Sequence, residues 1–199
     1  MRKTIIILSI AAATSFVLGL YSCQDSAAET TKTTSAEEIK AGRVKRGQYL
    51  VSIIGCDDCH SPKRMGPHGP ELIPELRLSG YPSSRPTQNA DTNVLKQGWA
   101  LFGGDLTSAV GPWGMSFSAN LTSDPTGIGN WTEDNFITAI RNGKAKGIKE
   151  GRDLLPPMPW FVYKNMTDED LKSIFAYLQT TRPVENRVPA PKPFKELKK

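Results

Sequence analysis

The chain has 199 residues, of which 38% are hydrophobic, so it is long enough for one domain with a substantial core. Its formal charge is +5, and removing residues 1–22 takes Arg2 and Lys3 away and leaves +3. Such a weak positive charge, concentrated in a basic tail at residues 191–199, argues against a nucleic-acid partner.

Residues 1–22 have the order of a secretory signal peptide. The basic "MRK" is followed by an apolar run and then by small residues, as export and cleavage require. The alternative is an uncleaved membrane anchor, and with either one the rest of the chain is exported. "LYSC" at residues 20–23 resembles the lipobox of bacterial lipoproteins, which predicts a lipid on Cys23 rather than the loss of this cysteine with the signal peptide. Polar residues 23–37 then form a flexible linker, and the domain is expected on the periplasmic side or at the cell surface.

A first helix is predicted over residues 37–54, because apolar residues recur there at helical spacing. Within it, Gly47 would let another helix approach closely. From residue 62 to 130, frequent Gly, Pro, Ser and Asn predict loops with only short helical turns. So long an irregular region requires another organising element, and a large buried cofactor would serve.

Two later segments carry clear helix signals. In "WTEDNFITAIRNGK", Thr132 is a predicted N-cap, acidic residues follow it, and Gly143 is the predicted stop. In "MTDEDLKSIFAYLQT", Thr167 is the predicted N-cap and apolar residues repeat at helical spacing. Both helices also begin with a predicted hydrophobic staple. Strong strand signals and internal repeats are not apparent.

"IIGCDDCHSPKR", residues 53–64, admits three interpretations. A zinc site needs about four ligands, and Cys56, Cys59, His60 and His68 are the one plausible set, but adjacent Cys59 and His60 suit one tetrahedral ion poorly. A redox disulfide would need a strand–helix–strand context that the chain lacks. In C-x-x-C-H, by contrast, one helical turn presents both thiols to the vinyl groups of a haem, and the next imidazole falls beneath the iron. This pattern, in an exported chain, predicts covalent haem.

The predicted iron ligand His60 needs a hydrogen-bond acceptor for its second ring nitrogen, usually a backbone carbonyl. The prolines that follow it, Pro62, Pro67 and Pro70, could fix such a carbonyl.

The sixth iron ligand decides what the haem does. Met65 and His68 lie too few residues beyond His60 to reach the opposite face easily, and Met166 belongs to a helix staple. Met158 lies in "LLPPMPW", where prolines restrict the backbone and could aim the thioether rigidly, which makes it the preferred ligand. Met115, in a loop, remains an alternative.

Three segments together resemble a class I-type, mono-haem bacterial cytochrome c: "GCDDCHSPK", "NLTSDPTGIGNWTEDNFITAIRNGK" and "LLPPMPWFVYKNMTDEDLKSIFAYLQTTRPVENRVP". The chain is also similar to the cytochrome c domains of membrane dehydrogenase cytochrome subunits. The resemblance covers about residues 40–190 and is loose between 63 and 110. It implies an all-α cytochrome c fold with long loops over residues 38–190, whose terminal helices cross near Gly47 and Phe175/Tyr177.

The resemblance also implies one covalently bound haem c per chain. Cys56 and Cys59 carry over as the attachment residues, His60 as the proximal iron ligand and Met158 as the distal one. Residues 120–131 would line the haem.

The predicted function is that of a one-electron carrier rather than an enzyme, because two side-chain ligands leave no iron position for a substrate. Its partners would be redox proteins: a dehydrogenase, a quinol-oxidising complex or a terminal oxidase. A lipid anchor on Cys23 would hold it at a membrane near them. The alternatives are a haem c subunit of a membrane dehydrogenase or oxidase complex, and a haem sensor or enzyme whose labile sixth position binds a small ligand.

Overall fold

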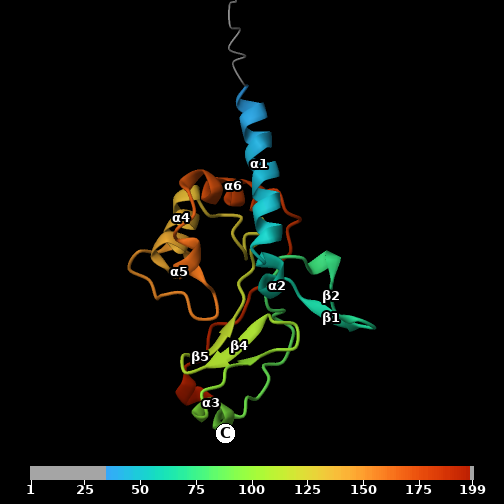
Figure 1. The fold of residues 1–199 in the computed structure, drawn as a ribbon, viewed down its shortest axis with the longest axis vertical. Helices are drawn as coiled ribbons and strands as arrows, with labels where there is room; N and C mark the ends of the chain where they lie inside the picture. The colour runs from blue at the N-terminus through green and yellow to red at the C-terminus, as the bar shows by residue number, and fades with distance from the viewer. Residues whose placement is uncertain (1–34, 198–199) are drawn as a thin grey trace, which may run out of the picture. The chain divides into compact units, whose positions relative to one another are not determined.

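Helix α1, Ala36–Ile53, opens the part of the chain, residues 35–197, that the computed structural model describes (Figure 1). It begins at a capping box, in which the Ser35 hydroxyl accepts from the Glu38 amide and the Glu38 carboxylate accepts from the Ser35 amide. The predicted signal peptide, Cys23 and most of the predicted linker lie outside the described residues. Within residues 35–197, none of the helices combines the length and the hydrophobicity that a membrane crossing requires.

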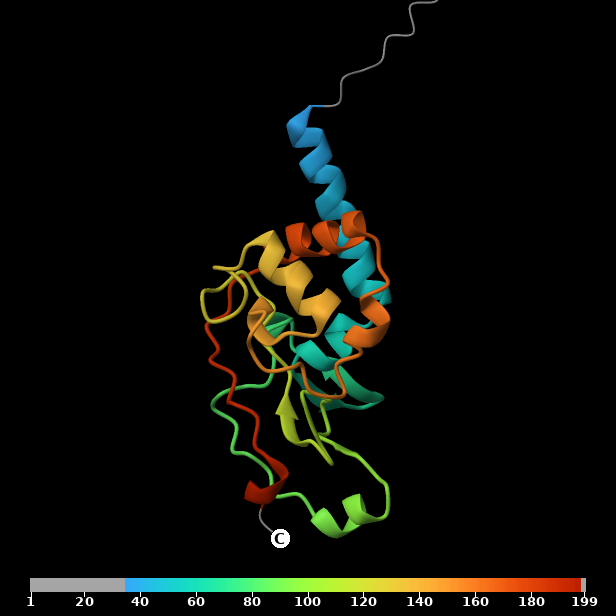
Figure 2. The ribbon, with the colours of Figure 1, turned by 90° about the vertical axis from the view of Figure 1, so that its left-hand side faces the viewer.

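Helix α6, Asp168–Leu178, crosses α1 at Gly47 (Figures 1 and 2). A Cβ atom at Gly47 would overlap the carbonyl oxygen of Ser173 and lie 2.7 Å from the Cβ atom of Tyr177. Only glycine therefore permits this approach. The prediction that Gly47 accommodates a second helix near Tyr177 is confirmed. Two interhelical ion pairs lie on the N-terminal side of the contact in both helices: Arg43–Glu169 and Arg46–Asp170.

Helix α4, Glu133–Asn142, and helix α6 begin where the sequence predicts. The Thr132 hydroxyl accepts from the amide of Asn135, and the Thr167 hydroxyl accepts from the amide of Asp170. Gly143 ends α4 with a φ of 63°, as a left-handed C-cap does. A further short helix, α5, spans Trp160–Tyr163. The remaining helical turns are α2 (Cys56–His60), α3 (Thr92–Lys96), η1 (Pro74–Leu76), η2 (Ala145–Gly147) and η3 (Phe194–Glu196).

The main hydrophobic core forms between α1, α4 and α6, with two loop residues closing it. Helix α1 contributes side chains from its C-terminal half, which places the residues that follow it directly beside this core. Burial of so many apolar side chains is the dominant favourable term in folding. The core residues are Leu50, Val51, Leu78, Ile128, Phe136, Ile140, Leu171, Ile174, Tyr177 and Leu178.

The predicted all-α fold class is wrong, because the segment expected to be irregular contains two small antiparallel sheets. Strands β1 (Lys63–Gly66) and β2 (Gly69–Leu72) form one hairpin. Strands β3 (Leu101–Phe102), β4 (Ser108–Gly111) and β5 (Gly114–Phe117) form a three-stranded sheet in that order. The strands have four residues or fewer, too few for a period-of-two pattern to stand out in the sequence.

Glycine closes the β1–β2 hairpin and the β4–β5 hairpin. In the first hairpin Gly66 is paired with Gly69, and in the second Gly111 is paired with Gly114, so each turn has two central residues. Gly69 and Gly114 have φ angles of 127° and 100°, which disfavour any residue with a Cβ atom. The same Gly-Pro composition that predicted loops therefore builds tight hairpin turns.

The three-stranded sheet has a small core of its own. Leu95 of α3, Val110 of β4 and Met115 of β5 are buried together. The backbone of Met115 exchanges two hydrogen bonds with Lys192, with N–O distances of 2.8 and 2.9 Å. Part of the predicted basic tail thus pairs with β5 and covers this second core.

Candidate functional site

Helix α2 carries both cysteines of the C-x-x-C-H motif on one turn. It follows α1 through Gly55, whose φ of 77° redirects the chain. Cys56 and Cys59 are half-buried free thiols. Burial, reinforced by the Asp57 carboxylate, raises the pKa of Cys56 to about 12, and burial raises the pKa of Cys59 as well. Both side chains are therefore protonated thiols near neutral pH.

The ring of His60 is fixed by a backbone carbonyl. Its Nδ1 atom lies 2.7 Å from the carbonyl oxygen of Ala119, and because a carbonyl only accepts, Nδ1 carries the proton and Nε2 keeps its lone pair. Burial lowers the pKa of His60, although the Ala119 hydrogen bond acts in the opposite direction. The expectation that a proline-fixed carbonyl within residues 61–70 accepts this bond is wrong. Strand β5 brings Ala119, 59 residues away, to the ring instead.

Asp57, between the two cysteines, anchors α2 to the rest of the domain. Its carboxylate accepts from Arg77 Nε at 3.0 Å and Arg77 Nη2 at 2.7 Å, and from the Ser61 hydroxyl at 2.7 Å. The Nη1 atom of Arg77 donates to the Tyr177 hydroxyl on α6 at 2.6 Å. Sequence reasoning missed this network because Arg77 and Tyr177 lie 20 and 100 residues from their partners.

Replacing Asp57 with Asn should destabilise the domain by about 1–3 kcal/mol, since a bidentate charge-assisted pair is lost and a partly buried Arg77 keeps its charge. Urea unfolding of the purified holoprotein measures the change. Asp58→Asn is the matched control, because Asp58 also lies between the cysteines but is exposed, and it should leave the unfolding midpoint unchanged. Equal effects of the two substitutions would contradict the anchoring role.

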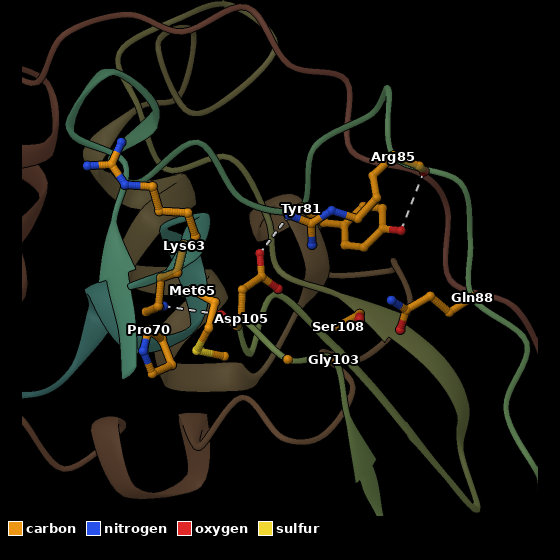
Figure 3. Close-up of a pocket in the computed structure, with 11 residues that line it drawn as sticks. Lys63, Met65, Pro70, Tyr81, Arg85, Gln88, Gly103, Asp105 and Ser108 are labelled. Atoms are coloured by element: carbon orange, nitrogen blue, oxygen red, sulfur yellow. Dashed lines mark hydrogen bonds and ion pairs between the residues drawn. The ribbon is translucent and has the colours of Figure 1, made fainter. Parts of the chain in front are cut away.

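Lys63 closes the C-terminal end of α2. Its ammonium group lies 2.6 Å from the Asp58 carbonyl oxygen, 3.0 Å from that of Ser61 and 3.1 Å from those of Asp57 and Asp105. A cation at this end of a helix satisfies carbonyl groups that have no intrahelical partner. Lys63 thus joins the turn that carries Cys56 and Cys59 to the loop that precedes β4 (Figure 3).

A surface cavity of about 250 Å³ lies beside Lys63 and does not include the cysteines, His60 or Met158 in its lining (Figure 3). Arg85 in its wall is paired with Asp105 at 2.8 Å, and the Lys63 ammonium is occupied by carbonyl oxygens. The charged groups of Arg85 and Lys63 therefore have partners within the protein. Because the lining contains none of the predicted haem-binding residues, the cavity is separate from the candidate site.

The candidate sixth ligands fall into different parts of the structure. Met158 is half-buried and packs against the main core, as Cys56 does. Met115 is 4% exposed and belongs to the second core, beside Leu95 and Val110. Met65 is 74% exposed on the β1–β2 hairpin. Of the two methionines that the sequence favoured, only Met158 shares a core with the cysteine turn.

These residues fit a covalently attached haem. Two thiols lie one helical turn apart, and the neighbouring imidazole has its Nδ1 proton engaged and its Nε2 lone pair free. Among residues 35–197, no group of three or more His, Cys, Asp or Glu side chains is arranged to hold a metal ion. The Tyr163 hydroxyl, which donates to the Ile54 carbonyl at 2.8 Å, ties α5 and the adjoining Met158 loop to the start of the cysteine turn.

No protein-family model matches the chain. Comparison with known proteins finds relatives that are each named as the cytochrome subunit of a dehydrogenase. The chain is 30% identical over 167 residues to the fructose dehydrogenase cytochrome subunit of Gluconobacter japonicus, covering 83% of this chain and 26% of the relative. It is 34% identical over 135 residues to the gluconate 2-dehydrogenase cytochrome c subunit of Pantoea cypripedii, covering 67% and 22%. It is 27% identical over 159 residues to the cytochrome c subunit of a quinone alcohol dehydrogenase of Gluconobacter oxydans, covering 77% and 25%. The chain thus spans about a quarter of the length of these relatives.

Proposed function

Over most of its length the chain is homologous to the cytochrome subunits of fructose, gluconate and alcohol dehydrogenases, and from this premise we propose that it is a c-type cytochrome that carries single electrons outside the cytoplasm. One haem c is assigned to each chain, attached through Cys56 and Cys59, with His60 and Met158 as iron ligands. A bound haem supplies reversible exchange of one electron between ferrous and ferric iron.

The observation that carries this function is the position of His60 on the same turn as both cysteines. Cys56 and Cys59 would hold a haem by addition of each thiol across a vinyl group, in which sulfur bonds to one carbon and the thiol proton goes to the other, so no oxidant is needed. His60 would hold the iron through Nε2, because the Ala119 carbonyl keeps the proton on Nδ1 and fixes the ring orientation.

Met158 is assigned as the second iron ligand because it packs against the same core as Cys56, whereas Met115 packs in the second core. A thioether ligand favours ferrous iron and raises the reduction potential. With His60 and Met158 both bound to it, the iron would have no free position for a substrate. The chain then transfers electrons and leaves substrate oxidation to a partner.

The partner that the comparisons favour is a dehydrogenase, because each of the relatives described above is named as the cytochrome subunit of one. The chain therefore acts either as a separate carrier or as the electron-carrying component of such a complex. Export and a lipid on Cys23 would keep it at a membrane, where the linker raises its effective concentration near membrane-bound partners.

Replacing Met158 with Leu tests the assignment, since leucine keeps the packing volume and removes the sulfur. The ferric protein should lose its sulfur-to-iron charge-transfer band, and the midpoint potential should fall by on the order of 0.1 V, because axial ligands set haem potentials over about 0.8 V. Visible spectroscopy with a redox titration measures both.

The matched control is Met115→Leu, which should keep the band and the potential. Loss of the band in Met115→Leu and its retention in Met158→Leu would transfer the assignment to Met115. Rapid carbon monoxide binding by the unaltered ferrous protein would instead favour a haem with a labile sixth position, as in a sensor or enzyme.

A further inference from the structure

One short stretch of chain, β5 and the residues after it, contacts both sides of the candidate site. At one end, the carbonyl oxygen of Ala119 lies 2.7 Å from Nδ1 of His60. At the other, the Ser116 hydroxyl donates to the carbonyl oxygen of Pro156 at 2.6 Å. Pro156 lies two residues before Met158. Residues 116–119 therefore bridge the proximal histidine and the loop of the distal methionine.

The Ser116 hydroxyl is oriented by a second hydrogen bond. Ser116 is 8% exposed, and its Oγ atom lies 3.3 Å from the indole Nε1 of Trp113. Because indole Nε1 only donates, Ser116 accepts from Trp113 and keeps its own proton for Pro156. The other acceptor in reach, the Ala109 carbonyl, is more distant at 3.4 Å.

The Trp113 ring is held in place by the turn between β4 and β5. It lies against Gly111, where a Cβ atom would overlap the ring, so the glycine provides the space that the indole occupies. The tight turn therefore places the indole of Trp113 where its Nε1 atom can donate to Ser116 on β5. The two hydrogen bonds from Trp113 to Ser116 and from Ser116 to Pro156 are thus positioned by the β4–β5 turn.

The bridging stretch is itself fixed along its length. The Ser118 amide donates to the Thr107 carbonyl at 2.9 Å, and the Ser118 carbonyl accepts from the Tyr81 amide at 3.0 Å. Three residues further on, the Leu121 amide donates to the Leu78 carbonyl at 2.8 Å. Because its backbone is hydrogen-bonded to three other segments, this stretch is well placed to position the groups that it contacts, the His60 ring and the Pro156 carbonyl.

The Met158 loop has fewer supports of its own. Within residues 154–158, which we call the Met158 loop, the backbone–backbone hydrogen bonds are those of the Leu154 amide to the Gly143 carbonyl at 2.6 Å and of the Met158 amide to the Leu155 carbonyl at 3.3 Å. Pro156 has no amide hydrogen to contribute and is exposed. The bond from Ser116 is thus the direct link between this part of the loop and β5.

We propose that Ser116, oriented by Trp113, is a positioning residue that holds the Met158 loop closed and so keeps the sixth iron ligand in place. The proposal rests on the assignment of Met158 as that ligand. It gives the β3–β4–β5 sheet a role in the site: Ser116 of β5 restrains the loop of Met158, and Ala119, two residues beyond β5, fixes the orientation of His60.

Ser116→Ala should raise the apparent association constant of the ferric holoprotein for imidazole about threefold to tenfold, because opening of the loop no longer breaks a neutral hydrogen bond. Absorbance titration with imidazole measures the constant. Ser118→Ala is the matched control, being the same change on the same stretch without the bond to Pro156, and it should bind imidazole as the unaltered protein does. Ser116→Thr keeps a hydroxyl and should restore the lower affinity.

The experiment separates a local from a general effect. In a Met158→Leu background, Ser116→Ala should change imidazole affinity no further, since there is no iron–sulfur bond left to protect. Unchanged imidazole affinity in Ser116→Ala with a lowered urea midpoint would overturn the proposal and leave Ser116 a purely structural role. Should Ser116→Ala yield no holoprotein, Trp113→Phe removes the orienting donor, and unaltered imidazole affinity in that variant contradicts the proposal.

Failure of the underlying assignment has its own signature. If Met158→Leu alone keeps the charge-transfer band, Met158 is not the ligand, and both the ligand assignment and the positioning role of Ser116 are refuted. If Met158→Leu loses the band while Ser116→Ala binds imidazole as the unaltered protein does, only the positioning role of Ser116 is refuted.

Discussion

Simultaneous replacement of Cys56 and Cys59 by alanine is expected to abolish covalent haem attachment completely. The two thiols are the described free cysteines, and they lie on the helical turn that also carries His60. Alanine leaves this turn helical but offers no sulfur to a vinyl group. Haem staining after denaturing electrophoresis, followed by a pyridine haemochrome spectrum of the extracted protein, measures the attached fraction.

The chain supplies a control for this result in its third cysteine. Cys23→Ala removes a thiol from outside the C-x-x-C-H turn and should leave the attached fraction unchanged. The single variants Cys56→Ala and Cys59→Ala should each retain at most one thioether, which shifts the haemochrome absorption because one vinyl group stays unsaturated. Haem that remains on the denatured double variant would refute covalent attachment at these residues.

Local signals in the sequence were sufficient for the longer helices. The Thr132 and Thr167 caps and the Gly143 stop act within one turn of the helices they limit, so the physics that places them is contained in a few neighbouring residues. Gly47 was informative for a similar reason. A glycine inside a helix weakens it, and the gain that offsets this is the close approach of α6.

The sheets could not be read in the same way. Strand β5 has four residues, and one side of its pairing comes from Lys192 in the C-terminal tail. Long-range partners of this kind are chosen by the tertiary fold, and short strands carry too little pattern to indicate them. The all-α expectation failed at this point, in the region where the resemblance to cytochromes c is loose.

In the candidate site, too, the residues in the local motif could be predicted, whereas their distant partners could not. The spacing of Cys56, Cys59 and His60 is a local property and singles them out directly. The groups that orient them are distant: Ala119 reaches His60 across 59 residues, and Arg77 reaches Asp57 across 20. The proposal of Met158 over Met115 also draws on the structure, because its support is that Met158 packs against the same core as Cys56, whereas Met115 belongs to the second core.

Gly47→Ala is expected to destabilise the domain by about 3 kcal/mol, although alanine favours a helix more than glycine does by about 0.5–1 kcal/mol. The added Cβ atom would overlap the backbone carbonyl of Ser173, which no side-chain rotation can move away. Helices α1 and α6 must then separate, and this opens the main core beside the cysteine turn. A loss of this size is a large part of the stability of a typical domain, about 5–15 kcal/mol.

The same substitution at Gly42 isolates the contact from the helix propensity. Gly42 lies on α1 five residues earlier, and a Cβ atom there would meet nothing within 4 Å. Gly42→Ala should therefore stabilise the holoprotein by about 0.5–1 kcal/mol, opposite in sign to Gly47→Ala. Urea unfolding of the two variants measures this difference. Changes of the same sign and size would mean that the crossing of α1 and α6 at Gly47 does not limit the stability of the domain.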